Sequence, residues 1–99
     1  LAISGSGKTR RTVEDAEAAK KLGVRVIAVT SKSDSPLASV ADAVIVVPGR
    51  VKGDQGSIQL LSSLFDQSVH IALDALCLML SRRDDVSDAD ANANHANVE

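Results

Sequence analysis

Hydrophobic residues recur with a helical period in one part of the chain and form unbroken runs in two others. Over residues 9–22 they return every three or four positions, which predicts an amphipathic helix that ends at Gly23. Residues 24–29 and 43–47 are almost wholly apolar and rich in β-branched side chains, which is typical of strands buried on both faces of a parallel sheet. Between them, Ser35 and Pro36 predict the N-cap and first position of a short helix through residue 41.

The first and last parts of the chain extend this pattern. Residues 1–3 are interpreted as the end of a strand, because a turn of glycine and serine follows them at once. Residues 58–83 form the longest helical pattern, and a capping box at Ser87 and Asp90 predicts a last helix from Asp88. Strands that alternate with helices predict an α/β fold, a doubly wound parallel-sheet sandwich of the flavodoxin-like kind, with a long C-terminal helix.

The length bounds the domain organisation. The 99 residues fit one small domain at most, and because no Met precedes the first strand we expect the sequence to begin inside a larger domain. Residues 1–83 are interpreted as the C-terminal part of that domain. Residues 84–99 are interpreted as a helix and tail that packs on a neighbouring subunit.

The long predicted helix is apolar on nearly every side over residues 69–80. It also carries Asp66 and Asp74, and an Asp at the centre of a membrane span costs about 2.5–3.5 kcal/mol, so we expect a buried helix and no membrane partner. Such a helix packs against its own sheet and against another subunit. Core packing then explains Cys77 and Met79.

Composition excludes several kinds of partner. The chain has 11 Lys and Arg against 13 Asp and Glu, a net charge of −2 and 1% aromatic residues. It therefore lacks the side chains that neutralise nucleic-acid phosphates and stack on bases, and no nucleic-acid partner is expected. A single cysteine excludes an internal disulfide and fits a reducing cytoplasm.

The strongest candidate for chemistry is the turn of residues 4–9, with the sequence SGSGKT. It places hydroxyls and backbone amides at the N-terminus of a helix, where an anion is favoured and small side chains let a phosphate approach. Residues 2–9 also satisfy a relaxed Walker A pattern, so a nucleotide-binding kinase is an alternative. Against that alternative, the loop after Ile3 is short for a nucleotide, and neither later strand ends in an Asp that would hold magnesium.

A second turn, residues 30–35, follows the next strand at the edge where open α/β sheets place their ligands. Two hydroxyl-rich turns that face one crevice suit a phosphorylated sugar better than a flat base. Ser35 also has a purely structural interpretation, as the cap of the helix that follows.

Several short motifs together resemble a known family. The turn SGSGxT, the run VIAVTS ending at Ser31, the stretch SPLA from Ser35 and the ADA of residues 41–43 resemble the sugar isomerase (SIS) domain of phosphosugar isomerases and phosphosugar-binding regulators. The helix segments LFDQS and LDA and the ending HANVE are similar to the 6-phospho-3-hexuloisomerases within that family.

The resemblance implies a cytoplasmic, tetrameric enzyme without metal or other cofactor. Its activity would interconvert 3-hexulose 6-phosphate and fructose 6-phosphate through an enediolate, in the ribulose monophosphate route of formaldehyde fixation. A non-catalytic phosphosugar-binding regulator of the same fold is the alternative. By match to the family motifs, the phosphate-binding residues would be Ser4, Ser6, Gly7, Thr9, Thr30, Ser31 and Ser35. Two positions depart from the family pattern, because Lys8 and Asp66 both stand where Glu is usual.

Moving a carbonyl between neighbouring carbons needs a base and a group that shuttles protons. Asp66, His70 and Asp74 follow one another at i,i+4 spacing, and in apolar surroundings they should bond to each other or face a cavity. Asp66 matches the family's helix carboxylate and is the candidate base, with a structural hydrogen bond between helices as the alternative. His70 is expected to be a packing residue, and two carboxylates with one His do not predict a metal site.

The tail carries two further candidates. Composition alone predicts that it is mobile and without a role. The resemblance instead implies that it folds over the sugar site of a neighbouring subunit. There His95 and Glu99 would supply acid and base groups.

Overall fold

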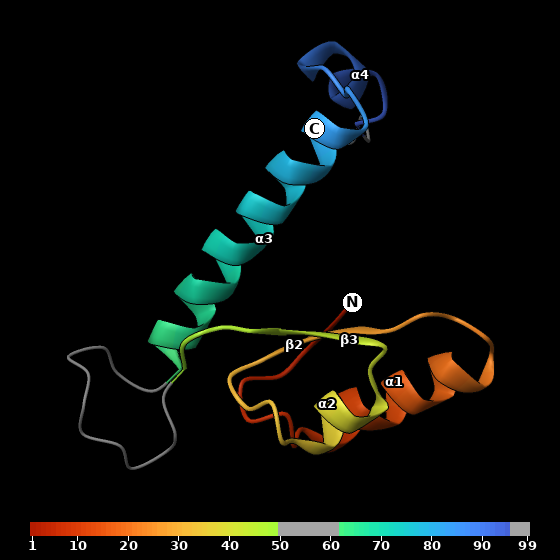
Figure 1. Cartoon of the computed structure of the whole chain (residues 1–99), viewed down its shortest axis with the longest axis vertical. Helices are drawn as coiled ribbons and strands as arrows, with labels where there is room; N and C mark the ends of the chain where they lie inside the picture. Colours follow the sequence, from red (N-terminus) through yellow and green to blue (C-terminus); the bar gives the residue numbers. More distant parts are fainter. Residues whose placement is uncertain (50–61, 96–99) are drawn as a thin grey trace.

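The centre of the fold is a parallel sheet with the strand order β1-β2-β3 (Figure 1). A computed structural model describes residues 1–49 and 62–95. The strands are β1 (Ala2–Ile3), β2 (Ile27–Thr30) and β3 (Ala43–Val46). β2 pairs with both neighbours, so that Ala28 lies opposite Ala2 on one side and Val44 on the other. The predicted parallel α/β architecture is confirmed.

The helices lie on both sides of this sheet (Figure 1). α1 (Arg10–Lys21) and α2 (Pro36–Val40) cover one face, and α3 (Ser63–Arg83) starts over the other and runs out to α4 (Asp88–Ala93). Ser35 caps α2 as predicted, since its hydroxyl accepts from the Ala38 amide at 3.3 Å. The predicted capping box of Ser87 and Asp90 is also confirmed. The predicted start of the long helix at residue 58 lies outside the described residues.

The hydrophobic core has one layer on each face of the sheet. Ala28 and Val29 are both fully buried, and because successive strand residues point to opposite faces, they belong to different layers. The first layer lies under α1 and α2, and the second under the start of α3. Their buried members are Ala16, Val26, Ala28 and Leu37 in the first, and Val29, Val47, Phe65 and Val69 in the second.

α3 is buried only where it begins, which corrects the prediction that its own sheet covers it, whereas its packing against another subunit stays a prediction. Phe65 and Val69 are buried, whereas Ile71 is 71% and Met79 67% exposed. Cys77 is exposed as well, so the prediction that it and Met79 pack in the core is wrong for this chain. The physical reason is that the sheet lies under only the first turns of α3, and the rest of the helix rises past it (Figure 1).

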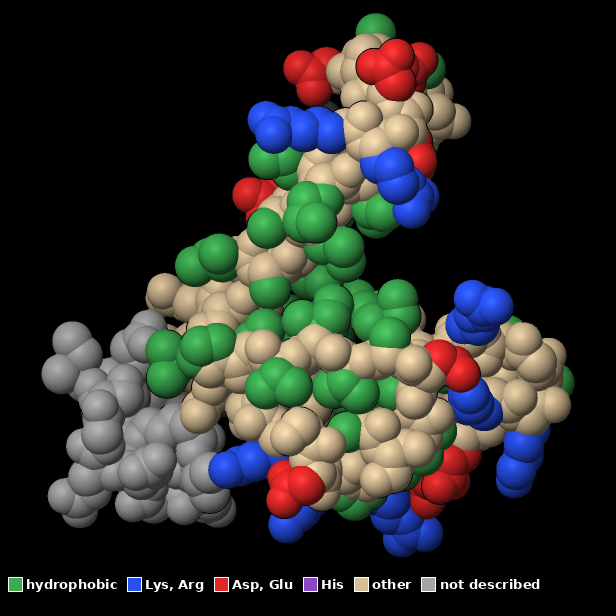
Figure 2. Space-filling model, viewed as in Figure 1, with side chains coloured by type: hydrophobic (Ala, Val, Ile, Leu, Met, Phe, Trp, Pro, Cys, Tyr) green, Lys and Arg blue, Asp and Glu red, His purple; other side chains and the backbone are tan. Residues whose placement is uncertain are grey.

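The exposed part of α3 is strongly apolar. Figure 2 shows hydrophobic side chains gathered along the helix and where it leaves the sheet, and Leu78 and Met79 are among those more than half exposed. By length and composition alone, α3 is suited to cross a membrane, with 11% of its apolar window buried. Its two Asp residues, 66 and 74, remain the argument against such a span.

One ionic contact joins the end of α1 to the beginnings of two strands. The Asp42 carboxylate accepts from the Val26 amide at 2.7 Å and pairs with the Lys20 ammonium. The Val26 carbonyl in turn accepts from the amides of Asp42 and Ala43. The bond from the Ala43 amide opens the pairing of β2 with β3, and β2 begins at Ile27 and not at residue 24 as predicted. The hydrogen bond from Lys20, followed by that from Val26, lowers the pKa of Asp42.

A charge-dependent effect on stability follows. We expect Asp42→Ala to lower the melting temperature more than Asp42→Asn, because the amide oxygen of Asn can still accept from Val26. The folded-state pKa lies below the ordinary value of 3.8, so the contribution of Asp42 is fully present above that pH and is lost as the pH falls through the folded pKa. Thermal unfolding between pH 7 and pH 2 measures this.

The matched control is Asp15→Asn, which removes an exposed ion pair with Arg11 on the surface of α1. Its effect should be small. A melting temperature of Asp42→Ala equal to that of the wild type at pH 7 would contradict the structural role given to this carboxylate.

Candidate functional site

Two turns that follow β1 and β2 lie side by side at the carboxyl edge of the sheet. The Gly5 carbonyl in the first turn accepts from the Ser31 amide at 3.0 Å, the Ser31 hydroxyl at 2.7 Å and the Thr30 hydroxyl at 3.2 Å. The Gly7 carbonyl accepts from the Leu37 amide at 3.0 Å. The prediction that two hydroxyl-rich turns face one crevice is therefore confirmed.

Gly7 is required where the turns approach most closely. Its φ of +65° is in the left-handed region that favours glycine. A Cβ at this position would overlap the Ser35 side chain and would lie 3.1 Å from the Thr30 hydroxyl oxygen. The sequence SGSG thus serves the close contact between the turns as well as the exposure of backbone amides.

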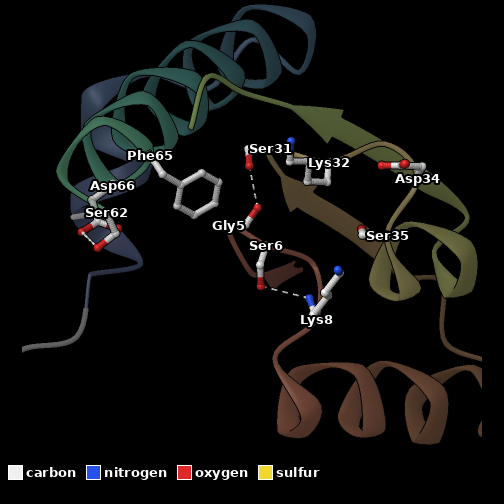
Figure 3. A pocket seen from close by; sticks show the side chains of 10 residues that line it. All are labelled: Gly5, Ser6, Lys8, Ser31, Lys32, Asp34, Ser35, Ser62, Phe65 and Asp66. Atoms are coloured by element: carbon white, nitrogen blue, oxygen red, sulfur yellow. Dashed lines mark hydrogen bonds between the residues drawn. The ribbon is translucent and has the colours of Figure 1, made fainter. Parts of the chain in front are cut away.

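The turns and the start of α3 enclose an open cavity of about 610 Å³ (Figure 3). A cavity of this size suits a small-molecule ligand. Residues of the two turns form one side, and residues from the beginning of α3 form the other. The lining comprises Gly5, Ser6, Lys8, Ser31, Lys32, Asp34, Ser35, Ser62, Phe65 and Asp66.

The Phe65 ring brings α3 against the first turn and against the segment that follows β3. A Cβ on Gly5 would lie 3.2 Å from the ring, and one on Gly49 would lie 3.3 Å from it. The ring is 7% exposed and belongs to the core layer under α3, so it forms an apolar wall of the cavity. Asp66, the next residue, is exposed at the cavity, and the Ser62 hydroxyl donates to its carboxylate at 3.4 Å.

The structure brings three of the predicted phosphate-binding residues to the cavity, namely Ser6, Ser31 and Ser35. The other four lie in the turns behind them. Ser4 and Thr30 are buried, and the Ser4 and Thr9 hydroxyls bond to each other at 2.8 Å. Their phosphate-binding role, like that of Gly7, stays a prediction.

The N-terminus of α1 has free capacity for an anion. Thr9 is its N-cap, but the Thr9 side chain makes no capping hydrogen bond, and the first turn contains no acidic residue. The first amides of a helix lack partners within the helix and carry its positive dipole end. By contrast, the amides of α2 are capped by Ser35.

The three residues of the predicted helix stripe do not act together. Asp66 lines the cavity, whereas His70 and Asp74 are exposed further along α3. No hydrogen bond joins any two of them, which corrects the expectation that all three bond together or face a cavity. The physical reason is that only the first turns of α3 meet the sheet and its turns. In the described ranges, no three His, Cys, Asp or Glu residues are grouped to hold a metal ion.

His95 lies far from the cavity of its own chain. It follows α4, beyond the end of α3 (Figure 1). From Asp66 to Arg83 the helix rises by about 25 Å, at about 1.5 Å per residue. The structure therefore does not bring His95 to this cavity, and its predicted catalytic role stays a prediction. Glu99 lies outside the described residues.

Sequence reasoning assigned no ligand role to several residues of the cavity. Lys32 and Asp34 lie in a segment that was singled out only for its hydroxyls. Whether Ser62 and Phe65 reach the cavity depends on where α3 begins. Their position in the sequence could have identified Lys32 and Asp34, because residues just beyond the carboxyl end of a parallel strand line the ligand crevice.

Comparison with known proteins gives a consistent result. The family model "SIS domain" matches residues 1–73. A 3-hexulose-6-phosphate isomerase of Mycobacterium gastri is 41% identical, and the match covers 100% of this chain and 51% of that protein. A 3-hexulose-6-phosphate isomerase of Bacillus subtilis is 34% identical, and the match covers 97% of this chain and 54% of that protein. The structure of an E. coli CFT073 protein in complex with arabinose 5-phosphate has a TM-score of 0.77 and 29% identity, covering 95% of this chain and 49% of that one. The chain thus spans about half the length of these proteins.

A pair of glycine substitutions separates backbone strain from crowding at the turn. Gly7 and Gly23 both have positive φ, but a Cβ on Gly23 would have no neighbouring atom within 4 Å. We expect Gly23→Ala to cost about 1–2 kcal/mol of unfolding free energy through its left-handed conformation. Gly7→Ala should cost about 1–3 kcal/mol more, because its Cβ also overlaps Ser35. Denaturant unfolding measures both, and equal losses would contradict the close packing of the turns.

Proposed function

The chain belongs to the SIS domain family, and on this basis we propose that it is part of a cytoplasmic phosphosugar isomerase. The proposed reaction interconverts 3-hexulose 6-phosphate and fructose 6-phosphate without a cofactor. The names of the relatives from M. gastri and B. subtilis support this substrate. The observation that carries the proposal is the cavity, which has serine hydroxyls of the two turns on one side and the Asp66 carboxylate on the other.

The phosphate of the sugar is assigned to the side formed by the turns. The Ser6 and Ser31 hydroxyls line the cavity there, and α1 begins at Arg10, directly after the turn that carries Ser6. Hydroxyls and the amides at a helix N-terminus are typical groups of phosphate-binding sites. The carbon chain of the sugar then extends along the Phe65 ring towards α3.

The proton transfer is assigned to Asp66. In the proposed step, its carboxylate takes the proton from C2 of 3-hexulose 6-phosphate, and the electron pair moves to form the C2–C3 enediolate. Return of that proton to C3, with transfer of the O2 proton to O3, leaves the carbonyl at C2. Asp66 is suited to this role because it is the one carboxylate of α3 that lines the cavity. A positioned carboxylate contributes about 10²–10⁴-fold to such a step.

We expect Asp66→Asn to lower kcat by about 10²–10⁴-fold with a much smaller change in KM, because the amide cannot accept the proton. Asp74→Asn is the matched control, since Asp74 is exposed two turns further along the same helix and does not line the cavity. Its kcat should be unchanged. Equal losses in the two variants would exclude Asp66 as the base.

Solvent exchange tests whether the protein is an enzyme at all. We expect incorporation of deuterium from heavy water into fructose 6-phosphate by the wild type and none by Asp66→Asn, because the enediolate exchanges its proton with the solvent. NMR of the sugar measures the exchange. Binding of fructose 6-phosphate without any exchange would instead favour a non-catalytic phosphosugar regulator.

The distance between His95 and the cavity leads us to propose a homo-oligomer, a tetramer in the family pattern, in which the tail of one subunit completes the site of another. The exposed apolar surface of α3, including Ile71 and Met79, supports packing against a second copy. In this arrangement His95 shuttles a proton between the oxygens of the enediolate, and Glu99 is an alternative base.

Subunit mixing tests this shared site. Asp66→Asn and His95→Asn should each be inactive alone, yet a refolded mixture should recover part of the wild-type activity, because some sites then combine an intact Asp66 with an intact His95. Activity assays with sedimentation of the mixture measure this. An inactive mixture that sediments as mixed oligomers would show that both groups act within one chain, and full activity of His95→Asn alone would show that His95 has no role.

A further inference from the structure

We propose that Lys8 and Lys32 together bind the phosphate of the sugar and make the cavity selective for a dianionic ligand. This proposal rests on the proposed function and deepens it. It concerns two residues of the cavity lining to which neither the hydroxyl pattern nor the helix stripe of the sequence gave a role.

The two lysines come from the two turns that meet at Gly5. Lys8 follows Ser6 in the first turn, and its amide donates to the Ser6 hydroxyl at 3.2 Å. Lys32 follows Ser31 in the second turn, and the Ser31 amide donates to the Gly5 carbonyl at 3.0 Å. Because this backbone bond fixes the spacing of the turns, both lysine stems start beside the hydroxyls assigned to the phosphate (Figure 3).

The charges of the cavity lining explain why hydroxyls alone are not sufficient to bind a phosphate here. Four of the lining residues are charged, and two of these are the carboxylates Asp34 and Asp66. A phosphate monoester brings a further charge of about −1.5 to −2 at neutral pH. Without Lys8 and Lys32, the described lining would hold two carboxylates and no cation, and it would repel the ligand. The lysines offset both the Asp34 carboxylate beside them and the phosphate itself.

These two ammonium groups are also available for a ligand. Within residues 1–49 and 62–95, the ion pairs use other cations. They are Arg10–Glu14, Arg11–Asp15, Lys20–Asp42 and Arg83–Asp84. Lys8 and Lys32 are both exposed at the cavity, where a flexible stem lets each ammonium reach a phosphate oxygen.

The two sides of the cavity therefore differ in net charge, with Lys8, Lys32 and Asp34 on the side of the turns and Asp66 on the side of α3. Figure 3 shows Asp66 and Ser62 on the α3 side, across the cavity from Lys32 and Ser35, with the Phe65 ring between the α3 carboxylate and the turns. A ligand with a dianion at one end and a neutral, reactive carbonyl at the other matches this difference. The same arrangement keeps the proposed base away from the ammonium groups.

Calorimetric titration with fructose 6-phosphate tests the proposal in the wild type and in Lys8→Gln, Lys32→Gln and the double variant. We expect each single change to weaken binding by about tenfold and the double change by more, since charge-assisted hydrogen bonds are roughly twice as strong as neutral ones. Raising the salt concentration should weaken binding to the wild type more than to the double variant, because salt screens exposed charges. KM should rise with kcat nearly unchanged.

The matched control is Lys21→Gln, an exposed lysine in the last turn of α1 and outside the cavity lining. It should bind within about twofold of the wild type, because salt screens the charge of an exposed lysine that does not contact the ligand. Binding by Lys8→Gln and Lys32→Gln equal to the wild type would overturn the proposal, as would an equal loss in Lys21→Gln. A wild type that does not bind fructose 6-phosphate would instead refute the proposed function, and this inference with it.

Discussion

The arrangement of the site depends on one close approach between two stretches of backbone. The Gly5 carbonyl accepts three hydrogen bonds from Thr30 and Ser31, and Gly7 lies so near Ser35 that no side chain fits on it. Parallel strands cannot be joined by a tight turn, so residues that follow neighbouring strands meet only through such contacts between their loops. Serine, threonine and glycine meet this requirement because they are small and can bond to exposed carbonyls.

Because of this contact between the turns, some hydroxyls are buried and structural, whereas others lie at the cavity, where they can bind a ligand. Thr30 is fully buried, and Ser4 bonds to Thr9, so these groups maintain the shape of the turns. Ser6 and Ser31 occupy the cavity side, although Ser31 also donates to the Gly5 carbonyl. A hydroxyl can donate one hydrogen bond and still accept others, so Ser31 can still accept from a water molecule that bridges it to a phosphate oxygen. The hydroxyls that match the family motif are therefore not equivalent, and only some of them touch the ligand space.

The sequence was sufficient for the elements and for the edge of the sheet that carries the site. Strand and helix patterns are local, as are the caps at Ser35 and Ser87, and the structure confirms them. The burial of α3 was not predictable, because a uniformly apolar helix has the same pattern whether its own sheet or another molecule covers it. Spacing along α3 grouped Asp66 with His70 and Asp74, but only the position of the sheet decides which of them meets the cavity. The lysines and Phe65 likewise entered the site through tertiary contacts.

The orientation of the proposed base is set by core residues of α3 that pack against the sheet. Phe65 and Val69 are four residues apart and therefore share one face of α3, which packs into the core layer with Val29 and Val47. Consecutive helix residues project about 100° apart, so fixing Phe65 against the sheet directs Asp66 to the neighbouring face, at the cavity. Rotating α3 by one residue would bury the carboxylate and expose the ring. The hydrophobic contact between α3 and β2 thus fixes the position of the carboxylate relative to the turns, and the rest of the helix is left free to pack elsewhere.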